Sequence, residues 1–479
     1  MGIVLKKRRR YGSAFLLVVF LCVSLWACSD DPWRFDPGPP GTPSGLAVTA
    51  GNGQVALSWS ASPKAAAYNV YYAASPGVGK STGTKISNIM NTSTIVTGLA
   101  NGRTCYFAVA AMNSSGESPL SNEVLATPVA PAAFQQSDLQ GTWYFNILVN
   151  GSGAAWMRGI AAIDGAGNVS VTSFFDSAGT TAAPANLFTT MAILPDGTVS
   201  QSGSDFHGVL AANQYKDMLV GTASPGGTSG MIAILQKRVP GITFSSSDIK
   251  GTGRLVAGPL PFAYHQLSSG VHRDWEYAVG QIGQDQAVTY TSITAPTAPV
   301  LPGGGSKVVT LSITPDGTVS ETPIAGAVPQ PNALLTWGVM SADKMTIVGT
   351  ATDTSGAFVL RVIQFIHPPS IALTPSTYVL GNLAGSYSIH QLINGASPLW
   401  ANGDLSIDGS GTEAFSSYLD SGGSAVLPPP TALSLDQQGA LKISADPSYN
   451  GQLSYFYDMV VSTRTDSPGI YSFGVALKR

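Results

Sequence analysis

Short alternations of apolar and polar residues, rather than long amphipathic runs, dominate the chain from about residue 46 onward. A typical stretch is Val55–Trp59 (VALSW), which has the period of a strand with one buried face. Asp-Gly pairs interrupt these alternations repeatedly, and such pairs favour the tight turns of antiparallel hairpins. The pattern therefore predicts an all-β chain of hairpin-connected strands.

One continuous apolar run departs from this pattern, at the N-terminus. A basic cluster at residues 6–10 precedes the run Ser13–Ala27, which closes as LWAC on Cys28. The run is too short, and its charge too one-sided, for a settled transmembrane helix. Residues 1–27 resemble a bacterial lipoprotein signal peptide, which implies that Cys28 carries palmitate-type acyl chains that anchor the protein to a membrane. Ser29 after the cysteine implies sorting to the outer membrane. Ordinary cleavage and an uncleaved anchor are the alternatives.

Composition narrows the class of protein. Of 479 residues only 11% are charged, while Gly (54) and Pro (32) are abundant, as in a turn-rich exterior β protein of several domains. A net charge of −3 offers no basic footprint for nucleic acid. Cys22 leaves with the signal and Cys28 would carry lipid, so Cys105 alone remains. We therefore expect no disulfide framework, no thiolate metal site and no cofactor.

Residues 28–45 are rich in Pro and Gly and are predicted to form an extended tether. Residues 46–128 then resemble a fibronectin type III domain, because Trp59 falls at that family's core tryptophan and Tyr68–Tyr72 alternates as its third strand. The family's tyrosine-corner position falls on Cys105, which cannot supply the corner hydroxyl. We interpret Cys105 as a small buried hydrophobic residue rather than a reactive thiol.

The rest of the chain contains three diverged repeats, at residues 137–239, 247–368 and 381–479. The intervals Gly141 to Asp176 and Gly385 to Asp420 are both 35 positions long. The shared landmarks are an opening glycine (Gly141, Gly251, Gly385), a tryptophan (Trp156, Trp275, Trp400) and a turn glycine (Gly197, Gly317, Gly439).

Each repeat is predicted to hold about eight strands that close into a small up-and-down barrel, because closure removes exposed strand edges. The alternative is two four-stranded blades per repeat and a single six-bladed propeller. The tryptophan and aspartate landmarks recur once per repeat rather than twice, which favours barrels. In the first repeat the strands are expected to begin near Thr142, Trp156, Val169, Phe188, Thr198, Phe206, Met218 and Met231.

The opening Gly-x-Trp and the closing basic residue of the first repeat resemble the lipocalin superfamily, in which an early tryptophan packs against a late arginine. The resemblance implies a pair of Trp143 with Arg238, and of Tyr387 with Arg479. In the middle repeat Gly253 stands at the aromatic position of the opening string. We interpret that repeat as having lost its aromatic anchor.

Several residues could carry chemistry but have a plainer structural interpretation. Gly79-Lys-Ser-Thr-Gly83 lies in a predicted loop, without the strand-to-helix elbow of a nucleophile and without the spacing of a phosphate loop. The repeated aspartates are predicted to close turns rather than bind calcium. The three repeat tryptophans are predicted to be core residues rather than sugar platforms. These aspartates are Asp164, Asp176, Asp408 and Asp420.

The middle repeat shows the strongest departure from the pattern, because Pro261–Arg273 has no counterpart when the opening strings are aligned. We interpret it as an inserted loop whose residues contact a partner. A surface metal site that also uses Glu276 is conceivable there, but a polar loop is the preferred interpretation. The candidate contact residues are His265, His272, Arg273 and Asp274.

No nucleophile stands with a base in the sequence, so we expect a protein that is not an enzyme. The sequence favours a lipid-anchored envelope protein that binds, adheres to or scaffolds a protein or polysaccharide partner. Two alternatives remain open: capture of a small apolar ligand inside lipocalin-like barrels, and hydrolysis of an extracellular polymer.

Overall fold

The computed structural model describes residues 38–479 with internal gaps. The predicted signal peptide, Cys28 and most of the tether lie outside the described residues. The gaps are residues 52, 91, 97, 130–132, 214, 226–227, 251–258, 272, 297–306, 327–332, 367–377, 379, 396–398 and 455–456.

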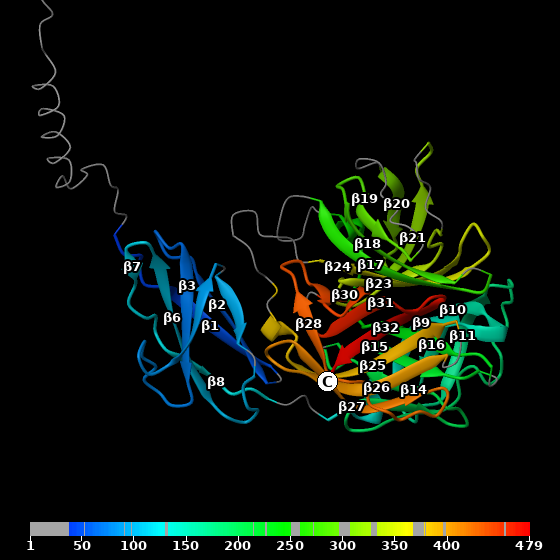
Figure 1. Ribbon diagram of the computed structural model, residues 1–479, viewed down its shortest axis with the longest axis horizontal. Helices are drawn as coiled ribbons and strands as arrows, with labels where there is room; N and C mark the ends of the chain where they lie inside the picture. Colours follow the sequence, from blue (N-terminus) through cyan, green and yellow to red (C-terminus); the bar gives the residue numbers. More distant parts are fainter. Residues whose placement is uncertain are drawn as a thin grey trace, which may run out of the picture.

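The first domain is a fibronectin type III-like sandwich, which stands to one side of the rest of the molecule (Figure 1). One sheet has the order β1-β2-β5; in the other, β4-β3-β6-β7 is extended by β8 on β6. Its strands are β1 (Ser44–Gly51), β2 (Gln54–Ser60), β3 (Ala67–Ala73), β4 (Thr84–Ile89), β5 (Ser93–Val96), β6 (Cys105–Asn113), β7 (Gly116–Glu117) and β8 (Val124–Ala126).

The sandwich core forms around Trp59, whose ring meets that of Tyr68 edge to face at 5.4 Å. Cys105 lies in the same core, and burial raises the pKa of its thiol. The interpretation of Cys105 as a buried hydrophobic residue is confirmed.

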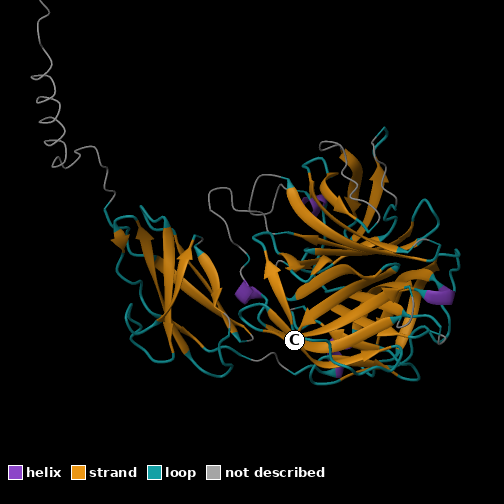
Figure 2. Cartoon of the chain, in the orientation of Figure 1, coloured by secondary structure: helices purple, strands orange, loops and turns teal. Residues whose placement is uncertain are grey.

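Three eight-stranded antiparallel sheets follow, which we call barrels 1 to 3, and strands joined by loops make up nearly all of the described chain (Figure 2). Barrel 1 contains α2 (Gln136–Leu139), β9 (Gly141–Val149), η2 (Gly151–Gly153), β10 (Ala155–Ile163), β11 (Val169–Asp176), β12 (Met191–Ile193), β13 (Thr198–Gln201), β14 (His207–Leu210), β15 (Met218–Ala223) and β16 (Met231–Lys237). Barrel 2 contains η3 (Ser246–Ile249), β17 (Leu260–Ser269), β18 (Asp274–Ile282), β19 (Ala287–Thr294), β20 (Lys307–Ile313), β21 (Thr318–Pro323), β22 (Gly338–Met340), β23 (Thr346–Thr352) and β24 (Phe358–Phe365).

Barrel 3 repeats the arrangement from η5 onward. Its elements are η5 (Leu380–Asn382), β25 (Gly385–Asn394), β26 (Trp400–Ile407), β27 (Thr412–Asp420), β28 (Thr431–Leu435), β29 (Ala440–Ile443), β30 (Asp446–Leu453), β31 (Met459–Ser467) and β32 (Ile470–Lys478).

Barrels 2 and 3 are closed, whereas the sheet of barrel 1 stays open between β11 and β12. At this opening the backbone N–H of Met191 donates to the carbonyl of Gly167 at 2.8 Å. Each repeat thus forms one eight-stranded sheet rather than two four-stranded blades. The propeller alternative is therefore wrong, and the all-β architecture of a sandwich followed by three related modules is confirmed.

Strand pairing aligns the repeats more securely than their opening strings do. The three repeat tryptophans pair with Leu148, Leu267 and Leu392, and five positions before these leucines stand Trp143, Phe262 and Tyr387. Phe262 is buried in the core of barrel 2. The expectation that the middle repeat lost its aromatic anchor is wrong, because the extra residues lie between η3 and β17 and shift the string.

The same pairing corrects two further expectations. Pro261–Arg273 is not an inserted loop, since most of it is β17, the first strand of barrel 2. The expected pairs of Trp143 with Arg238 and of Tyr387 with Arg479 are also wrong, each by one residue. Lys237, not Arg238, lies over the Trp143 ring, at 5.6 Å, and Lys478, not Arg479, lies over Tyr387. Successive side chains of a strand point to opposite faces, so the terminal arginines face outward.

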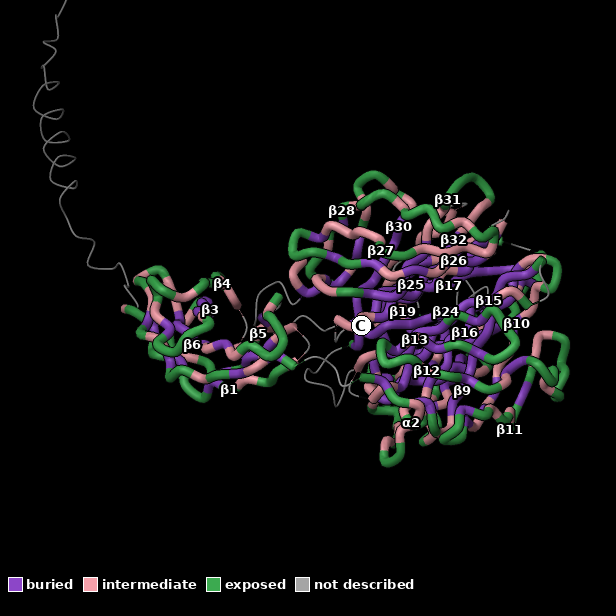
Figure 3. Tube along the Cα trace, turned by 90° about the horizontal axis from the view of Figure 1, so that it is seen from below, coloured by how far each residue is buried: buried purple, intermediate pink, exposed green. Residues whose placement is uncertain are grey.

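The barrels pack against one another as a ring, and their shared centre is buried (Figure 3). Strands β9 and β10 face β23 and β24, β17 and β18 face β31 and β32, and β25 and β26 face β15 and β16. We call these contacts seam 1–2, seam 2–3 and seam 3–1. Inward side chains fill each barrel as a separate core, while outward side chains of all three barrels form one common cluster.

Within the part of the chain that the structure describes, no helix has the length and apolar character needed to cross a membrane.

Candidate functional site

The three seams are built on the same hydrogen bond. Each repeat tryptophan is buried and donates its indole N–H to a hydroxyl of the next barrel. The prediction that these tryptophans are core residues is confirmed, although the core they join lies between barrels. The bonds are Trp156 to Thr352 at 2.8 Å, Trp275 to Thr465 at 2.9 Å and Trp400 to Ser224 at 2.7 Å.

A second polar contact repeats across the seams. Its residue lies on the first strand of each barrel, two positions before the leucine that pairs with the repeat tryptophan. His265 and His390 each bring Nδ1 to 3.3 Å from a threonine hydroxyl of the next barrel, and Asn146 occupies the equivalent position in barrel 1. Complete burial lowers the pKa of both imidazoles from 6.5 to about 3. Both imidazoles are therefore neutral at physiological pH. They form contacts across the seams rather than transfer protons.

At one end of the ring, the turns that follow β9, β17 and β25 are tied to one another in a cycle. Asn150 donates to Ile393 O and, at 3.1 Å, to Leu399 O of barrel 3. Asn394 donates to Ser268 O of barrel 2, and Ser269 donates to Val149 O of barrel 1 at 3.1 Å. Every barrel therefore holds one neighbour and is held by the other.

At the other end, three carboxyl groups come together where the barrels meet. Asp217 accepts from the backbone N–H of Ala342 in barrel 2 at 2.9 Å. Burial, together with the charges of Asp458 and Asp217, raises the pKa of Asp343 to about 7. Burial also raises the pKa of Asp217 and of Asp458. Lys237 and Lys478 are the cations that act on this group.

Barrel 2 encloses an ionic network of its own. The Arg361 guanidinium donates to Gln266 at 2.7 and 2.9 Å and to Glu321 at 3.2 Å, and it lies 4.7 Å from the Tyr264 ring. Burial raises the pKa of the nearby Glu276 carboxyl. Arg361 is only 2% exposed, so this network is sealed from any substrate and acts as a satisfied core contact.

The residues of the predicted contact loop do not gather at one site. His265 is buried in the middle of β17 and faces the seam, whereas Glu276 lies on the opposite face, inside barrel 2. Arg273 is exposed and Asp274 is the half-buried first residue of β18; His272 lies outside the described residues. His265 and Glu276 therefore lie on opposite faces of the sheet and cannot share one metal ion. Among the described residues no group of three His, Cys, Asp or Glu side chains is placed to hold a metal ion.

The repeated aspartates close turns, as predicted. Asp164 Oδ1 accepts from the backbone N–H groups of Ala166 and Asn168 at 2.9 and 2.8 Å. The other three aspartates accept in the same two-bond pattern from the residues two and four positions ahead: Asp176, Asp408 and Asp420.

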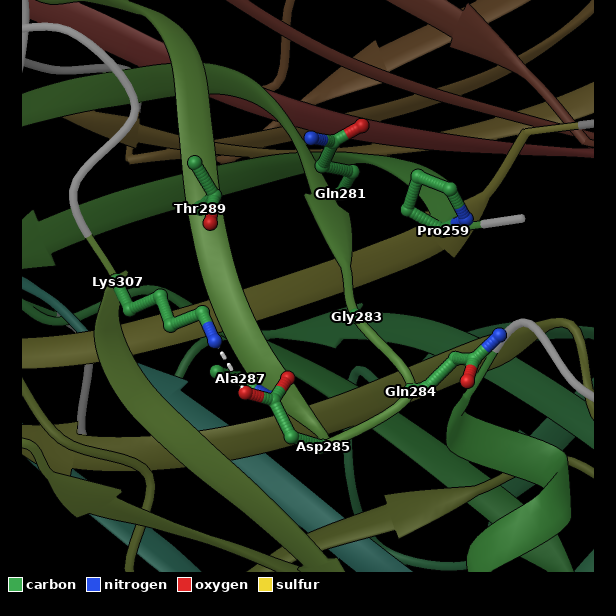
Figure 4. A pocket seen from close by; sticks show the side chains of 8 residues that line it. All are labelled: Pro259, Gln281, Gly283, Gln284, Asp285, Ala287, Thr289 and Lys307. Atoms are coloured by element: carbon green, nitrogen blue, oxygen red, sulfur yellow. Dashed lines mark hydrogen bonds and ion pairs between the residues drawn. The ribbon is translucent and has the colours of Figure 1, made fainter.

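A hollow of about 420 Å³ lies on the outer face of β18 and β19 (Figure 4). Its rim carries Asp285 and Lys307, which form an ion pair with each other. Gln281, Gln284 and Thr289 supply the remaining polar side chains. Its charges are already compensated, so the hollow has no group that selects a charged ligand.

A different surface group lies on seam 1–2. Arg158 of β10 is half-buried, and three rings surround its guanidinium carbon: Trp156 at 4.5 Å, Phe175 at 5.5 Å and Trp337 at 5.8 Å. Sequence reasoning missed this group, because Trp337 lies far from Arg158 in the chain and belongs to another repeat. The one available signal was the arginine two positions after a repeat tryptophan, where the other repeats have Tyr277 and Asn402.

Comparisons with known proteins cover the chain only in part. No family model matches. A stretch of 88 residues, 18% of this chain, is 41% identical to an amylopullulanase of Thermoanaerobacter thermohydrosulfuricus, and a stretch of 94 residues is 37% identical to an amylopullulanase of Thermoanaerobacterium thermosulfurigenes. The chain spans only 6% and 5% of those relatives, and the matched stretches are close in length to the sandwich.

Solved structures resemble the chain at low similarity. One titled FN3tt mut has a TM-score of 0.16 and 27% identity, and it covers 19% of this chain and 94% of its own. Transferrin binding protein B of Neisseria meningitidis serogroup B has a TM-score of 0.24 and 8% identity, covering 92% of this chain and 78% of its own. At these values the likeness carries no argument about function.

Proposed function

We propose that this chain is a non-catalytic binding protein of the cell envelope. A lipid on Cys28 anchors it, and the three barrels form the part that meets its partner. The observation that carries the proposal is the ring itself. Each barrel interior is filled by its own side chains, and the faces where two barrels meet are buried in the seams. The outer surface of the ring is what remains to meet a polysaccharide or protein partner.

The two alternative functions receive less support. A lipocalin-type ligand would have to displace packed residues such as Trp143, Phe262 and Tyr387, all at most 2% exposed. The similarity to amylopullulanases is confined to 5–6% of those enzymes, and the buried ionic group of barrel 2 is closed to a polymer.

Anchoring and binding are tested separately. With Cys28→Ala, we expect the protein to move from the outer-membrane fraction to the soluble fraction and to lose incorporation of a palmitate analogue, whereas Cys105→Ala should change neither. Residues 38–479, purified without the anchor, should bind immobilised envelope polysaccharide or envelope protein saturably while releasing no soluble fragments. Release of oligosaccharides or peptides with time would replace the proposal by a hydrolase.

A further inference from the structure

Seam 1–2 differs from its two counterparts at one equivalent position. The residue two places after the repeat tryptophan is Arg158 in barrel 1, Tyr277 in barrel 2 and Asn402 in barrel 3. All three project outward across a seam, and Asn402 reaches the Thr222 hydroxyl at 3.4 Å. Only Arg158 brings a positive charge to this position.

Rings from two barrels hold the Arg158 guanidinium in place. Trp156 and Phe175 come from barrel 1, and their rings lie 5.9 Å apart; Trp337 comes from barrel 2. Trp337 is itself supported by Tyr144, at 6.0 Å, whose hydroxyl donates to Asp316 at 3.2 Å. Planar rings around a guanidinium restrict its rotation and leave its edges for hydrogen bonding.

The charge of Arg158 has no carboxylate partner among the described residues. Nη1 donates to the Thr336 hydroxyl and to Thr350 O, both at 3.2 Å, and Nε and Nη2 make no hydrogen bond within the described chain. Burial alone lowers its pKa, to about 10, so the group stays charged. The other described arginines that are not exposed each face a carboxylate: Arg361, Arg464 and Arg479.

We infer that this group, the seam 1–2 site, binds the carboxylate of a uronic acid in an acidic polysaccharide. The site consists of Arg158, Phe175, Thr336 and Trp337. The free guanidinium edge fits a carboxylate through two parallel hydrogen bonds. The rings of Phe175 and Trp337, which are exposed and half-buried respectively, fit the flat carbon–hydrogen face of a pyranose, and the hydroxyl of the exposed Thr336 can bond to a sugar hydroxyl.

The surroundings favour a polysaccharide over a protein partner. A stable protein interface buries roughly 800 Å² per partner around an apolar centre. Phe175, 41% exposed, is the one large exposed apolar side chain of this group. The others in the described chain belong to different elements: Leu125, Val129, Leu194, Val271, Val426 and Leu427. The neighbouring Asp176 turns its carboxylate to the backbone of its own turn.

The inference names the partner class for the proposed binding function and so rests on it. The test is calorimetric titration of residues 38–479 with a defined oligogalacturonate and with its methyl ester, which lacks the charge. We expect the ester to bind about 10-fold more weakly than the acid, as the loss of a charge-assisted hydrogen bond predicts. Arg158→Gln should weaken binding of the acid by about 10-fold or more and abolish the preference over the ester.

Arg103→Gln is the matched control, because it removes an exposed arginine that lies in the sandwich, away from the seams, and should leave affinity unchanged. Arg158→Lys keeps the charge but not the paired geometry and should fall between wild type and Arg158→Gln, which also covers the case that the glutamine variant is unstable. Equal affinity of wild type for acid and ester, or of wild type and both Arg158 variants for the acid, would overturn the inference.

Displacement of the acid by an acidic peptide of equal charge at the same concentration would also overturn it, in favour of a protein partner. If oligogalacturonate does not bind while envelope material still binds equally to all variants, the inference fails and the proposed function stands. If envelope material does not bind either, both fail.

Discussion

Seam 1–2 and seam 3–1 are built from equivalent strands of their barrels, yet they differ in the side chains that they leave at the surface. In both, a buried tryptophan donates across the seam, through Trp156 in one and Trp400 in the other. Beside these tryptophans, Arg158 and Asn402 both donate to the neighbouring barrel, but Arg158 also carries a charge that no carboxylate of the described residues neutralises. The repeated residues hold the ring together, and the residue that is not repeated keeps an unpaired charge at the surface.

The largest effect we expect comes from breaking what the seams share. Trp156→Ala and Trp400→Ala should each lower the free energy of unfolding by about 3–5 kcal/mol, since each removes a large buried side chain and its hydrogen bond across the seam. Urea denaturation followed by circular dichroism measures this. Phe175→Ala, at an exposed position of the same seam, should cost less than about 1 kcal/mol. A similar loss in all three variants would contradict the division between holding and binding residues.

The three buried carboxyl groups where the barrels meet should make the stability of the ring depend on pH. The pKa of Asp343 is raised to about 7, so the folded state binds this proton more tightly than the unfolded chain. Its contribution to stability is therefore present below the unfolded pKa of 3.8 and is lost as pH rises through 7. Asp343→Asn should gain about 1–4 kcal/mol over wild type between pH 4 and pH 8.

This difference must be measured against wild type at each pH, because other groups titrate in the same ring. The depressed pKa values of His265 and His390, about 3, act in the opposite sense, and their stability is lost as pH falls from 6.5. Asp217, Asp458, Lys237 and Lys478 surround the site in both proteins. A constant difference between Asp343→Asn and wild type at all pH values would show that Asp343 has an ordinary pKa.

The smallest effects should come from the turns at the opposite end. Asn150 makes hydrogen bonds through both its amide nitrogen and its oxygen, whereas Ser269 makes a single bond at the equivalent position. We expect Asn150→Ala to cost about 1–3 kcal/mol and Ser269→Ala about 0.5–1.5 kcal/mol. Thermal unfolding midpoints rank the two. The reverse ranking would mean that the cycle of donors contributes little.

The period-two alternation was sufficient to predict the strands, and the repeated aspartates were sufficient to predict the turns, because both depend on neighbours close in sequence. The length of the repeats then predicted eight strands in each module. Aligning the repeats by their opening residues failed for the middle repeat. Extra residues between Ile249 and Leu260 place Phe262 further along the chain than the aromatic residues of the other two repeats. Strand pairing, which no single sequence displays, was needed to correct it. His265 was misplaced in a loop for the same reason.

The seams were within reach of the sequence but were not recognised. The closing strands read MIAIL in Met231–Leu235, VLRVI in Val359–Ile363 and FGVAL in Phe473–Leu477. The first and third runs contain no charged or polar residue, and Arg361 alone interrupts the second. Such runs indicate strands buried on both faces, which a solitary barrel with a solvent-exposed exterior does not need. Which barrel covers which face, and hence the meeting of Arg158 with Trp337, depends on packing among three separate repeats.

Modules that stack in a line can be gained or lost at either end, and each such change alters a single contact. Three modules in a ring have as many contacts as members, so the loss of any one breaks two and uncovers apolar faces on both survivors. A fourth would find no face to occupy. The number of repeats in this architecture is thus set by geometry, and variation among descendants of such a chain is expected in the surface residues and in the lengths of the loops.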